Sequence, residues 1–115
     1  MPTLKKGGNT LIERNLFRID GTTPLLISEL VTIQAQIIQY GRLKATYTLK
    51  PAPADDEIRE GSSTSTVEIE ITKELSETFR EGPVICRLFL EETDSDFVVD
   101  GEFASPEEFE MFTVE

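Results

Sequence analysis

Histidine and tryptophan are absent from this chain, and cysteine occurs once. Without histidine the chain itself cannot form a Ser-His-Asp or Cys-His catalytic arrangement, a histidine proton shuttle or a histidine metal ligand. A single cysteine excludes an intrachain disulfide and argues against a structural zinc site. Because Cys86 lies within the apolar run VICRLFL, we expect a small buried side chain rather than a nucleophile.

Long hydrophobic runs are also absent. No segment approaches the roughly 18 apolar residues that a membrane-spanning helix needs. The opening segment MPTLKKGGNT contains two lysines but is not followed by the apolar stretch of a signal peptide. The sequence therefore predicts a soluble protein, made in a reducing cytoplasm, that does not bind a membrane.

Charge is unevenly distributed along the chain, whose net charge is −11. Residues 1–50 carry seven Lys and Arg against three Asp and Glu, whereas residues 51–115 carry four against nineteen. The negative field disfavours binding to DNA or RNA. Unlike charges in the two parts of one chain could favour head-to-tail assembly, and the alternative is that the charge serves solubility alone.

Short alternating segments separated by turn signals dominate the sequence. In VTIQAQII and LKATYTL, apolar and polar residues alternate on either side of Tyr40-Gly41-Arg42, which predicts a β-hairpin. Val67, Ile69 and Ile71 form the most regular pattern, in STSTVEIEIT. The predicted strands cover residues 10–20, 31–38, 43–49, 63–72, 84–92, 96–103 and 108–114.

Two further segments have a less regular pattern. Thr23-Pro24 can start a short helical turn in TTPLLISELV, and an extended strand is the alternative there. Residues 51–63 form a predicted loop, with a short edge strand around 57–59. Short strands at roughly ten-residue spacing predict an all-β, antiparallel sandwich or barrel. The expected organisation is a flexible N-terminal arm, residues 1–10, followed by one β-sandwich domain, residues 11–115.

The segment ITKELSETFREGPV predicts a helical corner between two strands. Thr72 can accept a hydrogen bond as the N-cap of a short helix. Leu75 and Phe79 are four residues apart and can fill one end of the core. Gly82 suits the left-handed position after a helix, and Pro83 prevents the helix from continuing. The glutamates of this segment are then solvated surface groups rather than an acidic site.

Acidic residues are numerous but their spacing indicates no particular chemistry. Asp94, Asp96 and Asp100 could offer oxygens to Ca²⁺, but they lack the spacing of an EF-hand loop, and Asp is a common turn residue. Paired carboxylates could hydrolyse a glycosidic bond, but among 22 acids such pairs arise by chance. We therefore assign no catalytic, cofactor-binding or metal-binding residue and expect a protein that is not an enzyme.

The corner and two earlier segments resemble a module of phage tail and baseplate proteins. The similar segments are Gly21-Thr22-Thr23-Pro24-Leu25, Val31 to Gln39, Ile71-Thr72-Lys73-Glu74 with Thr78, Phe79, Gly82 and Val84, and Cys86-Arg87-Leu88. Together they resemble the N-terminal domain of siphophage upper baseplate proteins over roughly residues 15–115. The resemblance implies an immunoglobulin-like sandwich with one short helical corner.

The same resemblance implies a function in a virus particle. We expect a structural virion protein of a tailed bacteriophage, assembled in the host bacterial cytoplasm, in the tail, baseplate, neck or capsid surface. It would form a homo-oligomer and dock to other virion proteins, with Lys5, Lys6 and Arg14 as the expected assembly contact. The alternative is a carbohydrate- or receptor-binding module that uses the loops of the sandwich.

Overall fold

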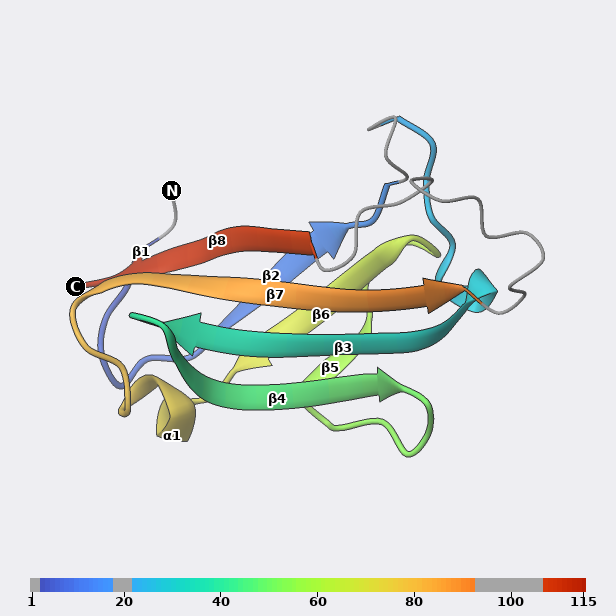
Figure 1. Cartoon of the computed structure of the whole chain (residues 1–115). Helices are drawn as coiled ribbons and strands as arrows, with labels where there is room; N and C mark the ends of the chain where they lie inside the picture. Colours follow the sequence, from blue (N-terminus) through green and yellow to red (C-terminus); the bar gives the residue numbers. More distant parts are fainter. Residues whose placement is uncertain (1–2, 18–21, 93–106) are drawn as a thin grey trace.

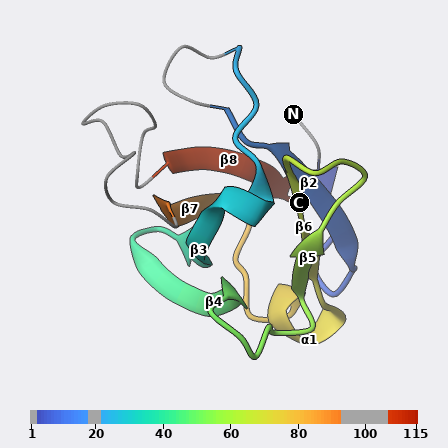
Figure 2. The ribbon, with the colours of Figure 1, turned by 90° about the vertical axis from the view of Figure 1, so that its right-hand side faces the viewer.

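Two β-sheets pack face to face in the computed structural model, which describes residues 3–17, 22–92 and 107–115. Viewed along the strands, the two sheets form separate layers with the core between them (Figure 2). The five-stranded sheet has the order β1-β8-β7-β3-β4, and the three-stranded sheet has the order β2-β6-β5. All strand pairs are antiparallel except β1 with β8. The predicted all-β sandwich is confirmed.

Most strands lie within two residues of the predicted alternating segments, but β2 and β6 are shorter than predicted and β1 was not predicted. Their bounds are β1 Thr3–Leu4, β2 Thr10–Asn15, β3 Leu30–Gln39, β4 Arg42–Lys50, β5 Ile58–Glu60, β6 Thr66–Ile71, β7 Gly82–Glu92 and β8 Glu107–Val114. The strand predicted at residues 96–103 lies outside the described residues.

One apolar core fills the space between the sheets. Alternate residues of β3 and β6 are fully buried, as their period of two predicts: Ile33, Ala35 and Ile37 from β3, and Val67, Ile69 and Ile71 from β6. Cys86 of β7 is buried in the same core, which confirms its expected packing role.

The hairpin between β3 and β4 turns through only two residues, Tyr40 and Gly41. Both have a positive φ, 51° and 73° respectively, and Gln39 pairs with Arg42. Two residues with positive φ match the twist of adjacent strands, and glycine adopts that conformation without steric cost. The turn is therefore tighter than the three-residue turn predicted from the sequence.

A β-bulge near this turn changes which side chains of β4 face the core. Ala45 pairs with Ile37, but the next pair is Leu43 with Ile38, so Lys44 is an extra residue on β4. The alternation is shifted by this residue, and Leu43 is 57% exposed. The prediction that Leu43 shares the buried face of Ala45 is wrong for this reason.

The first residues of the chain lie along the sandwich rather than extending from it. Leu4 of β1 is buried and pairs with Val114 of β8. The backbone N–H of Gly7 donates to Oγ of Ser76, at 2.9 Å. The sequence predicted a flexible arm over residues 1–10. Within this segment, Thr3 and Leu4 form β1 at the edge of the sandwich, because Leu4 is apolar and its backbone completes a strand pair.

The corner between β6 and β7 contains the short helix α1, Lys73–Ser76. Oγ1 of Thr72 accepts a hydrogen bond from the Leu75 N–H at 3.2 Å, which places Thr72 at the N-cap. The helix ends at Ser76, whereas the sequence predicted that it would continue almost to Gly82. It ends early because the Phe79 N–H bonds to the Ser76 carbonyl, a tighter turn that brings the Phe79 ring into the core.

A second helical turn, the 3₁₀ segment Ile27–Glu29, leads into β3. It begins three residues later than the predicted start at Pro24, which instead forms an isolated bridge with Phe17. Leu25 and Leu30 on either side of the turn are buried. The turn therefore anchors the connection from β2 to β3 on the core.

Phe79→Ala should lower the free energy of unfolding by about 3–5 kcal/mol. The Phe79 side chain is 1% exposed and meets the Phe112 ring edge-on, with ring centroids 5.9 Å apart, so its removal leaves a cavity between the sheets. Urea unfolding followed by circular dichroism measures the change. Phe17→Ala is the matched control, because that ring is 42% exposed, and should cost less than about 1 kcal/mol. Equal effects of the two substitutions would contradict the corner's role in the core.

Candidate functional site

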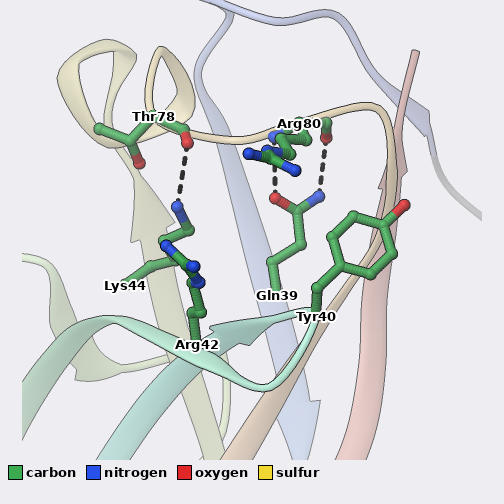
Figure 3. Close-up of a pocket in the computed structure, with 6 residues that line it drawn as sticks. All are labelled: Gln39, Tyr40, Arg42, Lys44, Thr78 and Arg80. Carbon is green, nitrogen blue, oxygen red and sulfur yellow. Dashed lines mark hydrogen bonds between the residues drawn. The ribbon is translucent and has the colours of Figure 1, made fainter.

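A hollow of about 280 Å³ opens between the β3–β4 hairpin and the corner (Figure 3). Six residues line it: Gln39, Tyr40, Arg42, Lys44, Thr78 and Arg80. Three of the six are cations, although the whole chain has a net charge of −11. We call this feature the basic hollow. It concentrates positive charge at one end of a predominantly negative molecule.

The floor of the basic hollow is held by a buried amide. Gln39 at the end of β3 is 2% exposed, and its Nε2 donates to the Arg80 carbonyl at 2.7 Å. The Arg80 N–H donates back to Gln39 Oε1 at 2.8 Å. One side chain thus satisfies both backbone groups of a residue 41 positions away. These two hydrogen bonds fasten the hairpin to the corner.

Tyr40 makes a second link between the same two segments. Its hydroxyl donates to the Glu81 carbonyl at 2.6 Å, while the side chain as a whole is 63% exposed. The phenol lies against Gly82, where any Cβ would collide with it. Gly82 also has a φ of 128°, which disfavours other residues. Gly82 thus permits the close approach of the ring at the start of β7 and is not the residue after a helix.

The three cations face the hollow from two segments. Figure 3 shows Arg42 and Lys44 on β4 and Arg80 on the corner. Lys44 Nζ donates to the Thr78 carbonyl at 3.1 Å, which fixes its position. The Arg42 and Arg80 side chains are exposed, and the ion pairs within the described part of the chain involve Arg59 and Arg87 instead. Two guanidinium groups are therefore available to an anionic ligand.

The other end of β4 is acidic. Asp55 and Asp56 are exposed in the loop that follows β4, and Asp55 caps the strand edge. Its Oδ2 accepts from the Thr48 N–H at 2.7 Å, and its own N–H donates to the Thr48 carbonyl at 2.8 Å. Burial, and then the charges of Glu57, Asp55 and Glu70, raise the pKa of the Tyr47 hydroxyl. The negative field of this acidic loop, residues 54–57, thus reaches the adjacent strand.

The three cations predicted as an assembly contact are not gathered at one place. Lys5 and Lys6 are exposed in the turn before β2. Arg14 lies near the opposite end of β2, with its guanidinium carbon 4.4 Å from the centroid of the Phe109 ring, a cation–π contact within the chain. Their role in assembly stays a prediction. Sequence reasoning missed the basic hollow, because Arg80 is far from Arg42 and Lys44 along the chain.

Metal-binding residues and membrane-spanning helices were the other features considered from the sequence. Among residues 3–17, 22–92 and 107–115, no group of three or more Cys, Asp and Glu could hold a metal ion. Asp94, Asp96 and Asp100 lie outside these residues. A search of the same part of the chain found no helix with the length and apolar character to cross a membrane. We take the basic hollow as the candidate site because three cations converge on it and a buried amide fixes its floor.

No model of a known protein family matches the chain, and the search of curated proteins also found no match.

Gln39→Glu should destabilise the protein by about 2–4 kcal/mol at pH 7, because an ionised carboxylate would face the Arg80 carbonyl without a proton to donate. Burial should raise the pKa of the introduced carboxyl above its unfolded value of about 4.3, because the guanidinium groups that would lower it are exposed and screened by solvent. Between the unfolded-state pKa and the higher folded-state pKa, the folded variant binds more protons than the unfolded one. Its stability therefore falls as the pH rises through this range. Below the unfolded value, the protonated acid can replace both hydrogen bonds of the amide.

Urea unfolding of both proteins at pH 4 and pH 7 measures the difference between wild type and variant at each pH. Gln36→Glu is the matched control, because it adds the same charge at a half-buried position of the same strand. The control should show a smaller loss with little pH dependence. A loss for Gln39→Glu that is equal at both pH values would contradict the proposed role of the amide.

Proposed function

We propose that this chain is a non-enzymatic structural protein of a tailed bacteriophage. In this proposal the sandwich is an immunoglobulin-like module of the tail, baseplate, neck or capsid surface, and it docks to other virion proteins as a multimer. The observation that carries the proposal is the corner. Three of its residues, Thr72, Phe79 and Gly82, belong to the segment that most resembles phage baseplate modules. Thr72 caps α1, Phe79 fills the core, and Gly82 admits the Tyr40 ring where the chain passes from one sheet to the other.

The surface around the basic hollow supports assembly as the mode of action. Tyr40 is exposed and lines the hollow together with the exposed Arg42 and Arg80. Aromatic residues and arginines are enriched at the centres of protein interfaces, where they contribute most of the binding energy. The hollow is fixed by side-chain hydrogen bonds from the hairpin to the backbone of the corner before any partner arrives, so docking needs little rearrangement. Recognition by shape and charge is the mechanism that such a surface favours.

An antibody raised against the purified chain tests the proposal directly. Tailed particles produced by the strain that encodes the chain should be labelled at one defined place in immuno-electron microscopy. Particles from a deletion strain are the control and should show no label. Intact particles that contain none of the chain, by both labelling and mass spectrometry, would overturn the proposal.

The lysines of the N-terminal segment provide a separate test of the predicted assembly contact. Lys5→Glu with Lys6→Glu should weaken self-association about tenfold if these exposed side chains bind an acidic surface. Point substitutions are preferable to a deletion, because removing residues 1–10 would also remove β1. Analytical ultracentrifugation measures the association constant, and the charge-preserving pair Lys5→Arg with Lys6→Arg is the control. An unchanged constant in the Glu variant would refute this contact alone.

A further inference from the structure

The basic hollow and the acidic loop lie at opposite ends of strand β4. The two cations near the acidic end are engaged within the chain: Lys50 donates to the Ile27 and Leu30 carbonyls, and Arg59 pairs with Glu68 and Glu70. The basic hollow lies at the beginning of the strand, with Arg42 and Lys44 on β4 itself. The acidic loop with Asp55, Asp56 and Glu57 follows its end and folds back beside Thr48. β4 is also the outermost strand of the five-stranded sheet, so this charge pattern lies along an open edge (Figure 1).

The edge of β4 is covered over only part of its length. At the acidic end, Asp55 occupies both backbone groups of Thr48. This cover prevents a continuous added strand, which is a common protection of sheet edges. At the basic end no such cover is seen among the described residues, and the exposed Tyr40 lines the basic hollow together with the cations. The basic end is thus open to a partner, whereas the acidic end is closed to strand addition.

Charge decides which partner suits this edge. A nucleic acid is disfavoured, because three local cations in a chain of net charge −11 cannot follow a long phosphate backbone. An acidic protein segment of limited length fits better, since it needs only a few carboxylates. This chain itself presents such a segment, the acidic loop, on the same edge.

The direction of pairing also follows from the charges. If two copies meet along β4 in opposite directions, each basic hollow lies beside the acidic loop of the other copy. If they meet in the same direction, like charges face each other at both ends. Opposite directions correspond to a two-fold axis, which gives a closed dimer with two identical contacts.

We propose that a second copy of this chain docks antiparallel along β4, with the Asp56 and Glu57 side chains of each copy against Arg42 and Arg80 of the other. This inference rests on the proposed assembly function and specifies one of its contacts. Tyr40 and Leu43 would be covered near the ends of the interface.

Charge reversal in two matched variants tests the pairing. Variant one carries Arg42→Glu and Arg80→Glu, and variant two carries Asp56→Lys and Glu57→Lys. Each alone brings like charges together in both contacts, so each should dimerise at least about tenfold more weakly than wild type. An equimolar mixture should recover the dimer, because both contacts then join opposite charges. Light scattering coupled to size exclusion measures the masses, and circular dichroism verifies that both variants fold.

A variant that combines Arg42→Glu and Arg80→Glu with Glu13→Lys and Glu110→Lys is the control for net charge, because its net charge returns to the wild-type value of −11. Glu13 on β2 and Glu110 on β8 are exposed, and neither strand adjoins β4. This variant should stay as dissociated as variant one. Recovery in the control would show a general charge effect and would overturn the inference.

The outcomes separate this inference from the proposed function. A wild-type chain that is monomeric at every concentration, or an oligomer that variant one leaves intact, would overturn the β4 pairing. Neither result would remove the chain from virus particles, so the labelling test would still stand. A β4 dimer together with particles that lack the chain would refute the proposed function and leave the pairing intact.

Discussion

The basic hollow depends above all on one interaction, the pair of hydrogen bonds that the buried Gln39 amide makes with the corner. The two hydrogen bonds with Arg80 join the end of β3 to the corner that carries the chain from one sheet to the other. A buried amide needs both its donor and its acceptor satisfied, so it specifies one relative position of hairpin and corner. The place of Arg80 beside Arg42, and therefore the basic hollow, follows from that position.

The corner itself is stabilised on both sides of this amide. Thr72 caps α1, and Phe79 fills the end of the core against Phe112. On the surface, Tyr40 reaches over Gly82 to the Glu81 carbonyl. The same residues that close the sandwich thus also shape the basic hollow. Structural support and the candidate site share one end of the molecule, which suits the docking function that we propose.

Much of the fold could be predicted because alternation with period two is a local property. Ile33, Ala35 and Ile37 identified β3, and Val67, Ile69 and Ile71 identified β6, because each pattern shows one buried face. The errors lie where distant contacts override local preference. Leu43 faces outward because a bulge shifts the alternation of β4. Leu4 is buried because β1 pairs with β8. Neither the bulge nor the parallel pair has a clear signal in the sequence.

The sequence by itself determined the all-β class, the capped corner and the uneven charge. Hydrophobic period and helix capping depend only on residues that are neighbours along the chain, and charge depends on composition alone. Only the tertiary structure decided where that charge gathers. Arg42, Lys44 and Arg80 meet because the hairpin and the corner are fastened together, and the acidic loop returns to β4 because Asp55 bonds to Thr48. Such contacts join residues that are separated along the chain, so they depend on the packed sandwich as a whole.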